Sequence, residues 1–200
     1  MLKKCKCFQF ADDTVFLYEI FSEDNVSELQ NDLNLFHEWC LKMGLVLNVN
    51  KTKHLRITLK DVDLPKYTLN GINIECVNSH EHLGIILNDK MCFDDYVDKI
   101  VKKSFIKWAM IVQYCKSVNS NVLLKLYTSY VMPIIEFASL AYYLNITNLE
   151  RIEKIQRKVT KFICYKMQKS NLSYEQRLNE LSLLSIKMFV GLTIIKKYIV

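Results

Sequence analysis

The chain has 200 residues and a mass of 23.6 kDa, which allows one large domain or two small ones. Half of the residues are hydrophobic, which excludes wholesale disorder, and only 4 glycines and 2 prolines exclude collagen-like, linker-like and many-turned sandwich architectures. Residues 1–100 carry 11 basic and 16 acidic side chains, whereas residues 101–200 carry 16 basic and 5 acidic ones, so the second half, at +11, is suited to a polyanionic partner.

The first part of the chain is rich in expected strands. Residues 7–21 predict two short strands around an Ala-Asp-Asp turn, because the flanking residues are β-branched or aromatic. Apolar residues at helical spacing predict a helix over 24–43. Residues 45–59 and His82–Leu87 have strand composition, and the Asn-Gly pair inside Tyr67–Ile74 predicts a tight hairpin.

From about residue 93 the pattern becomes helical. Long helices are expected over 93–115 and 120–143, the second interrupted by Pro133. An amphipathic helix is expected over 148–168, and one or two more over 173–199. A strand-rich part followed by an all-helical part indicates the α+β class, with domains at 1–90 and 91–200.

Cysteine usage and the termini bear on location. Seven scattered cysteines without a CxxC pair are typical of reduced thiols inside a cell, in the cytoplasm or the nucleus. The N-terminal segment lacks the apolar stretch of a signal peptide, and the longest apolar run near the C-terminus, MFVGLTII, is too short to span a bilayer. We therefore expect no membrane partner.

Asp12 and Asp13 are the most informative pair. Two adjacent carboxylates at the tip of an apolar hairpin are costly unless a cation neutralises them. Mg²⁺ prefers oxygen ligands and is often completed by waters and substrate phosphates, and carboxylates hold the cations of two-metal phosphoryl transfer. Taken alone, the pair could also be purely structural, because aspartate favours turns through local hydrogen bonds.

Further segments in the same order give the pair a context. FADDTVFL resembles the [FY]ADD signature of reverse transcriptases, and the downstream order resembles the enzymes of non-LTR retrotransposons (LINE, jockey-like). The matching segments are LQNDLNLFHEWCLKMGL, LNVNKTK, HLGIILN, LLKLYTSYVMPIIEFAS, LERIEKIQRKVTKFI and YEQRLNELSLLSI. The resemblance, over about residues 7–195, implies part of a polymerase palm, with antiparallel strands and a helix, followed by a helical thumb-like region and a C-terminal extension.

The resemblance also implies roles for single residues. Asp12 and Asp13 would be the catalytic pair and would hold Mg²⁺, or Mn²⁺ in its place. Phe10 would lie under the primer end, Lys51 in the vicinity of the nucleotide, and Gly84 where the backbone closely approaches the primer strand.

The basic face of the expected helix 148–168 is the second candidate site. Phosphate contacts of a thumb are implied for Arg151, Lys154, Lys158 and Lys161, although such a face is also common on any solvated helix. The implied partners are an RNA template with a DNA primer, or an RNA–DNA hybrid. The implied reaction is Mg²⁺-dependent addition of deoxynucleotides to a primer 3′ end.

In this family the fingers and the first palm segments, with a further metal-binding aspartate, lie upstream of the ADD hairpin. We therefore expect the chain to be a fragment with an incomplete site that binds Mg²⁺ weakly and is inactive alone. One alternative is a non-catalytic remnant that binds nucleic acid through its basic helices. A third possibility is a decayed element without function.

Overall fold

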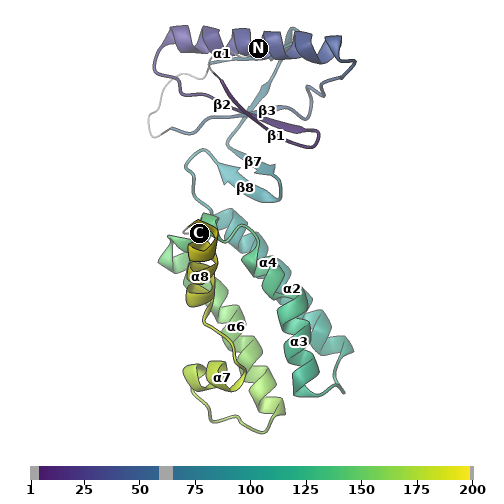
Figure 1. Cartoon of the computed structure of the whole chain (residues 1–200), viewed down its shortest axis with the longest axis vertical. Coiled ribbons are helices and arrows are strands. Elements are labelled where there is room, and N and C mark those ends of the chain that lie inside the picture. Colours follow the sequence, from purple (N-terminus) through teal and green to yellow (C-terminus); the bar gives the residue numbers. More distant parts are fainter. Residues whose placement is uncertain (1–4, 59–64, 199–200) are drawn as a thin grey trace. The chain divides into compact units, whose positions relative to one another are not determined.

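The computed structural model describes residues 5–58 and 65–198, with side chains described as far as Leu192 in the last helix. Short sheets occur in the first part and helices dominate the second (Figure 1), which is compatible with the α+β class. The chain divides into two compact units. One comprises the residues up to 80 together with 88–91, and the other comprises 81–87 together with the residues from 92 onward.

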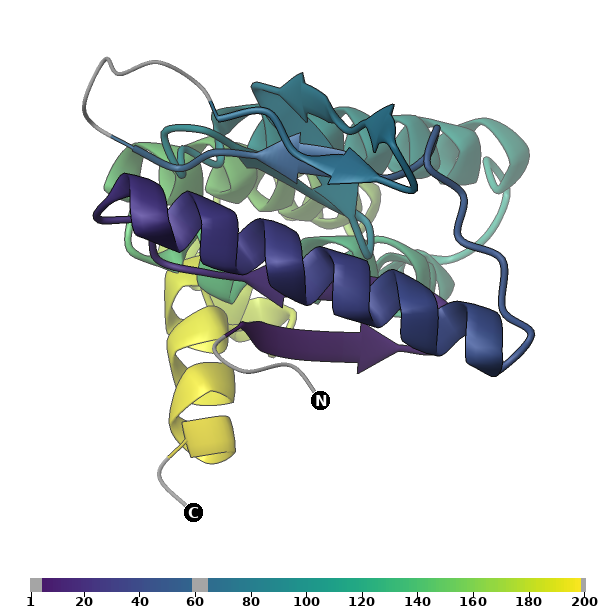
Figure 2. The ribbon, with the colours of Figure 1, turned by 90° about the horizontal axis from the view of Figure 1, so that it is seen from above.

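The first unit is built around one long helix. A hairpin of β1 (Lys6–Phe10) and β2 (Asp13–Leu17) precedes α1 (Glu23–Lys42), so the two predicted strands and the predicted helix are confirmed. The helix lies along the strands of this unit (Figure 2), and buried Leu33 packs with Tyr67 in a small core. Phe16 of β2 packs against the same core, so α1 supports the β1–β2 hairpin.

Short strands complete the first unit. They are β3 (Lys53–Leu55) and β6 (Glu75–Val77), which pair in parallel, and β4 (Thr68–Leu69) and β5 (Ile72–Asn73), which form a hairpin. Asn70 and Gly71 form its turn with φ of 51° and 71°, as a type I′ turn requires, so the predicted hairpin is confirmed. Gln30 of α1 holds it, because its side-chain amide donates to and accepts from the backbone of Thr68.

The strand predicted over residues 45–59 is largely wrong. Only Lys53–Leu55 is a strand, and Val46 is 92% exposed in an irregular segment; residue 59 lies outside the described residues. Asn48 explains the interruption, because its side chain accepts a hydrogen bond from the Lys51 N–H at 3.2 Å and stabilises a turn. Local hydrogen bonding thus competes with the strand ladder here.

The single strand predicted over His82–Leu87 is only partly confirmed, because the segment holds the end of one strand, a turn and most of the next strand. The two strands are β7 (Ser79–His82) and β8 (Ile85–Asn88), with Leu83 and Gly84 at φ of 48° and 84° between them. Both φ values are left-handed, which an extended strand does not allow. The Leu-Gly pair therefore reverses the chain.

From residue 92 onward the second unit is helical, as predicted. Its helices are α2 (Asp94–Tyr114), α3 (Ser120–Tyr130), α4 (Met132–Glu136), α5 (Leu140–Tyr143), α6 (Ile146–Lys166), α7 (Tyr174–Glu180) and α8 (Ile186–Tyr198). Pro133 lies in the first turn of α4 and ends the preceding helical run, because proline cannot continue it. Of the helices in the described ranges, none has both the length and the hydropathy that a membrane crossing needs.

Helices α2 and α6 run side by side in the same direction. Contacts join them in chain order: Asp98 to Arg151, Phe105 to Lys158, Trp108 to Phe162 and, just after the end of α2, the Lys116 carbonyl to Lys166. Trp108, 7% exposed, also meets Tyr127 of α3 edge to face, with ring centroids 6.1 Å apart. The core of this unit therefore joins buried residues of α2, α3 and α6 with others from α4, α5 and α8.

Candidate functional site

The two aspartates lie at the tip of the β1–β2 hairpin. Phe10 pairs with Asp13 in the last register position, and Ala11 and Asp12 form the turn between them. Ala11 has a left-handed φ of 53°, and Gln9 supports the turn by donating to the Ala11 carbonyl at 3.1 Å. Both carboxylates are exposed.

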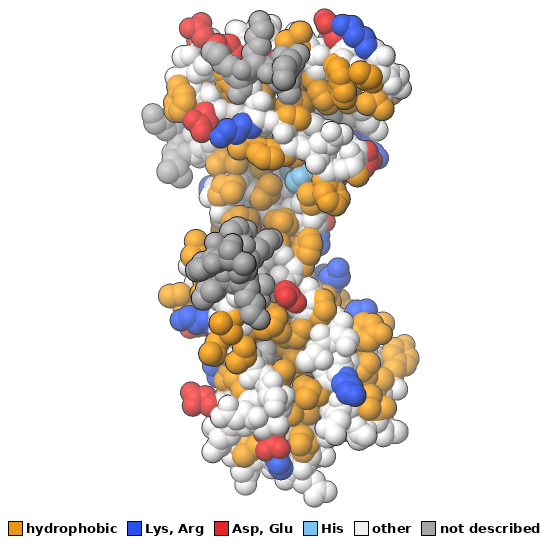
Figure 3. All heavy atoms as spheres, viewed as in Figure 1, with side chains coloured by type: hydrophobic (Ala, Val, Ile, Leu, Met, Phe, Trp, Pro, Cys, Tyr) orange, Lys and Arg blue, Asp and Glu red, His pale blue; other side chains and the backbone are white. Residues whose placement is uncertain are grey.

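The hairpin has one supported face and one open face. Phe16 packs edge to face on Phe36 of α1, with ring centroids 4.8 Å apart, so the face that carries Phe16 is turned toward the helix. Side chains alternate along a strand, and Phe8, Phe10 and Asp13 therefore share the opposite face. Phe8 and Phe10 are 58% and 66% exposed. Hydrophobic side chains likewise reach the visible surface of this unit in Figure 3.

The base of the hairpin is tied to α1 by polar contacts. The Cys5 N–H donates to Asp32 at 3.1 Å, and Asp32 is only 3% exposed. Burial, followed by the nearby Asp32 carboxylate, raises the pKa of the Cys5 thiol to about 11, which keeps it protonated. Tyr18 donates to Glu28 at 2.6 Å, and this bond raises the pKa of Tyr18 to about 12. The strands are thus fixed at their base, while the tip remains accessible.

The tip fits a divalent cation only in part. Asp12 and Asp13 supply carboxylate oxygens, the ligands that Mg²⁺ prefers. Within residues 5–58 and 65–198, no group of three His, Cys, Asp or Glu side chains lies close enough together to hold a metal. A cation here would rely on waters or substrate oxygens for most of its coordination.

The other residues predicted near the primer or nucleotide lie elsewhere. Lys51 is exposed in the turn before β3, in the same unit as Asp12. Gly84 belongs to the second unit, where a Cβ atom at its position would lie 3.4 Å from the Phe137 ring. Their predicted roles, like those of the aspartates and Phe10, stay predictions.

The predicted basic face of α6 borders a groove between α2 and α6 of about 380 Å³. The groove is lined by Val101, Phe105, Arg151, Lys154, Arg157 and Lys158. The Lys158 ammonium lies 4.5 Å from the Phe105 ring centroid, and the Arg157 guanidinium lies 4.3 Å from that of Tyr174. Lys161 is exposed but does not line the groove.

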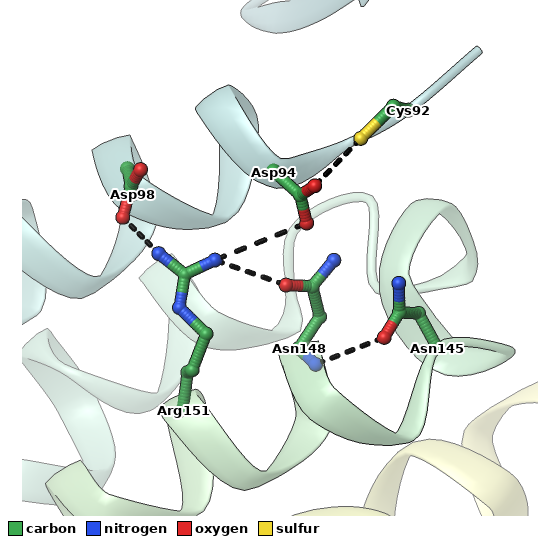
Figure 4. A network of polar contacts seen from close by, with 6 residues as sticks. All are labelled: Cys92, Asp94, Asp98, Asn145, Asn148 and Arg151. Atoms are coloured by element: carbon green, nitrogen blue, oxygen red, sulfur yellow. Dashed lines mark hydrogen bonds and ion pairs between the residues drawn. The ribbon is translucent and has the colours of Figure 1, made fainter. Parts of the chain in front are cut away.

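Arg151 differs from its neighbours because carboxylates oppose its charge (Figure 4). Its guanidinium pairs with Asp98, lies 3.9 Å from Asp94 and donates to Asn148 at 3.0 Å. The Cys92 thiol donates to Asp94 at 2.7 Å. Among the four predicted phosphate ligands, Arg151 is therefore the least available, and it joins the starts of α2 and α6.

Comparison with known proteins gives two distant relatives. The chain is 26% identical over 162 residues to the RNA-directed DNA polymerase from mobile element jockey of Drosophila funebris. It is 22% identical over 159 residues to the probable RNA-directed DNA polymerase from transposon X-element of Drosophila melanogaster. The chain is similar to polymerases of mobile elements. Each match covers 77% of the chain but only 17% and 18% of the relatives, so the chain spans less than a fifth of their length.

This similarity confirms the predicted resemblance to mobile-element reverse transcriptases at the level of distant relatives. No family model matches the chain, and no solved structure matches it. The assignment of palm and thumb, and the position within a longer polymerase, stay predictions.

Sequence reasoning left Arg157 out of the candidate phosphate ligands. It belongs to the same basic stripe of α6, three residues after Lys154, so the spacing carried the signal. What the sequence could not show is that Tyr174 of α7 holds this guanidinium at the rim of the groove.

The contacts of the Asp94 carboxylate should stabilise the helical unit less as the pH falls. The hydrogen bond from Cys92, followed by the nearby Asn148 amide and the charge of Arg151, lowers the pKa of Asp94 from its ordinary value. A carboxyl with a lowered folded pKa stabilises the fold above its unfolded pKa and loses that effect as pH falls through the folded value. We expect Asp94→Asn to destabilise the helical unit at pH 7, and the difference from wild type to vanish on acidification below that folded value.

The measurement is urea unfolding of wild type and of Asp94→Asn, from pH 7 down to a pH below the folded pKa of Asp94. Asp95→Asn, at the next residue of α2, is the matched control because it leaves the contacts of Asp94 with Cys92 and Arg151 in place. An Asp94→Asn effect of constant size at every pH would contradict the prediction.

Proposed function

We propose that the chain is the part of a non-LTR retrotransposon reverse transcriptase that carries the paired carboxylates and the basic helix facing the nucleic acid. The observation that carries the proposal is the exposed Asp12–Asp13 pair at the tip of a supported hairpin, in a chain similar to RNA-directed DNA polymerases. RNA template and DNA primer, or their hybrid, would be the partners.

The hairpin suits the proposed reaction chemically. Asp12 and Asp13 would hold Mg²⁺ or Mn²⁺, and when bound the ion would stabilise charge on the oxygens of phosphoryl transfer. Phe10 shares the exposed face of the hairpin with Asp13, so its ring would support the sugar or base beside the carboxylates. The fixed base of the hairpin keeps both groups in place.

The proposal includes inactivity of these 200 residues alone. Two carboxylates without a third nearby ligand in the described part of the chain give weak metal binding. Positioning of reacting groups supplies a large share of the rate, and a loosely held ion positions its substrate poorly. Templated primer extension by the purified chain would contradict this part of the proposal.

The experiment is a chimera. The matching segment of the Drosophila funebris jockey polymerase is replaced by this chain, and extension of a DNA primer on an RNA template is measured with Mg²⁺. We expect extension to be retained. A folded chimera that binds template–primer and does not extend it would overturn the proposal.

A direct measurement on the chain itself guards against a chimera that fails to fold. Mn²⁺ titration followed by electron paramagnetic resonance should show weak binding that Asp12→Asn removes. Asp95→Asn, an exposed aspartate at the start of α2, is the control and should leave binding unchanged. Equal Mn²⁺ affinity of wild type and Asp12→Asn would overturn the assignment of the metal ligands.

A second candidate is nucleic-acid binding without catalysis. It is favoured by the cations of α6 that no described carboxylate pairs with, Lys154, Arg157, Lys158 and Lys161. This candidate predicts salt-dependent binding that Asp12→Asn leaves unchanged, whereas polymerase function requires Asp12.

Removal of two α6 lysines should reduce the salt dependence of binding. We expect the Lys154→Gln, Lys161→Gln double variant to lower the slope of log K against log salt by about 1.8 on B-form DNA, since each phosphate contact contributes about 0.9. Fluorescence anisotropy between about 50 and 200 mM salt measures the slope. Lys169→Gln is the control, because Lys169 is paired with Glu180 at 2.6 Å. An equal slope in all three proteins would contradict the prediction.

A further inference from the structure

We propose that Tyr174 of α7 is a positioning residue for nucleic-acid binding, because its hydroxyl occupies Glu153 and thereby keeps the Arg157 guanidinium of α6 available to a backbone phosphate. The inference rests on the proposed function, since it concerns the nucleic-acid face of α6. It goes further because it assigns a role in binding to a residue outside that face and to a hydrogen bond between two helices.

Arg157 is an exposed cation whose head group is held in place without being neutralised. It lines the groove with Lys154 and Lys158, and these three positions adjoin one another on the surface of α6. The Arg157 guanidinium lies over the Tyr174 ring, 4.3 Å from its centroid, a contact that orients the head group and leaves its charge intact. In the part of the chain that the structure describes, no carboxylate forms an ion pair with it.

Glu153 is the acidic residue that could neutralise Arg157. It precedes Arg157 by four residues on α6, which is the spacing and the order in which a glutamate pairs well with a following cation. Both of its carboxylate oxygens are occupied instead. Oε1 accepts from the Tyr174 hydroxyl, and Oε2 accepts from the Ile186 N–H at 2.9 Å. Glu153 therefore joins α6 to α7 and α8 and leaves Arg157 uncompensated.

Several contacts hold Tyr174 in this place. Helix α7 packs against α6 (Figure 1), and Ser173 and Gln176 form a capping box that fixes its first turn. The Arg177 guanidinium also lies over the Tyr174 ring, 5.6 Å from its centroid, and donates to a backbone carbonyl of the preceding loop at 2.8 Å. Burial, followed by the hydrogen bond to Glu153, raises the pKa of Tyr174, so its hydroxyl remains a donor at neutral pH.

Loss of the Tyr174 hydroxyl would release Glu153 toward Arg157. The Oε1 atom would lose its donor, and an ion pair with the guanidinium four residues later would satisfy it. Such a pair competes with a phosphate for the same guanidinium N–H groups. Tyr174→Phe makes this single change and keeps the ring that Arg157 contacts.

The test is a double-mutant cycle that measures nucleic-acid binding. Fluorescence anisotropy of a labelled DNA duplex is recorded between about 50 and 200 mM salt. Arg157→Gln should lower the slope of log K against log salt by about 0.9, the contribution of one phosphate contact. Tyr174→Phe should weaken binding about 2-fold, the effect of a competing ion pair at this spacing. In the Arg157→Gln background, Tyr174→Phe should have no effect on binding.

Two further backgrounds separate this role from a general effect on the fold. Glu153→Gln removes the carboxylate and keeps an amide that can bond to Tyr174 and to the Ile186 N–H, so Tyr174→Phe should leave binding unchanged there. Lys161→Gln is the matched control, because it removes a different exposed cation of α6. In that background Tyr174→Phe should still weaken binding about 2-fold.

Glu153→Gln also keeps the inference testable if Tyr174→Phe does not fold. With Tyr174 in place, it should change affinity by the same factor in the wild-type and Arg157→Gln backgrounds. A larger gain in wild type would mean that Glu153 already pairs with Arg157, and the inference would fail.

The outcomes distinguish this inference from the proposed function. If Arg157→Gln changes neither affinity nor slope, or if Tyr174→Phe has no effect or the same effect in the wild-type and Arg157→Gln backgrounds, the inference is overturned while the proposed function stands. If wild type binds no nucleic acid in a salt-dependent way, the nucleic-acid face of α6 is overturned as well.

Discussion

Replacing Asp12 by asparagine is expected to reduce primer extension by the jockey chimera at least about 100-fold, because even outer-shell partners of a metal ligand are typically worth 10–100-fold. Asparagine keeps the size and the turn preference of aspartate and removes only the charge. The measurement is single-nucleotide extension on an RNA template at saturating Mg²⁺.

The controls separate chemistry from folding and binding. Asp13→Asn should also impair extension, whereas Asp95→Asn should leave it unchanged. Template–primer affinity of the Asp12→Asn chimera should stay close to that of its parent, because the phosphate contacts are assigned to α6. A parallel loss of affinity and extension would mean that Asp12 acts through binding or folding, and the catalytic assignment would fail.

Replacing Trp108 by alanine is expected to lower the free energy of unfolding of the helical unit by about 3–5 kcal/mol, as for other buried large-to-small changes. Trp108 is 7% exposed and touches the rings of both Tyr127 and Phe162. Its removal therefore opens a cavity at the junction of α2, α3 and α6. Urea unfolding followed by far-ultraviolet circular dichroism measures the change.

Trp39 provides the matched control, because the chain has only these two tryptophans. Trp39 is 44% exposed on α1, where it stacks on Phe36, so Trp39→Ala should change the free energy of unfolding much less. The Trp39→Ala variant leaves Trp108 as a fluorescent reporter of the helical unit, and the Trp108→Ala variant leaves Trp39 as a reporter of the first unit. Similar losses in the two variants would show that Trp108 is not the centre of the helical core.

The helices could be predicted from the sequence because their apolar residues recur at helical spacing over many turns. Helix α1, expected over 24–43, occupies Glu23–Lys42, and α2, expected over 93–115, occupies Asp94–Tyr114. Pro133 divided the next run as expected. These elements depend on local pattern and local chemistry, which a sequence displays directly.

The short strands were harder to predict because their composition does not reveal where the chain turns. The Asn70–Gly71 turn was predictable, since both residues accept a positive φ. Leu83 takes the same conformation without such a preference, so the β7–β8 turn was missed. Around Asn48, a side-chain hydrogen bond decided the outcome against a composition that favoured a strand.

The candidate sites show the same division between local and tertiary information. The Asp12–Asp13 turn and the stripe of α6 cations are local, and both could be located from the sequence. The compensation of Arg151 by Asp94 and Asp98 depends on a contact across 53 residues, and the groove between α2 and α6 depends on these helices lying side by side. Sequence spacing alone could not separate the available cations from the compensated one.

The parallel pairing of α2 and α6 also determines when the helical unit can fold during synthesis. The partners Asp98 and Arg151 are 53 residues apart, and Lys116 and Lys166 are 50 apart. At about 5–20 residues per second, a ribosome needs about 3–10 s to make that interval. During this time the apolar side of α2 lacks its main partner on the nascent chain. The unfinished unit is therefore prone to aggregation over those seconds, although the same apolar side chains are buried in the finished core.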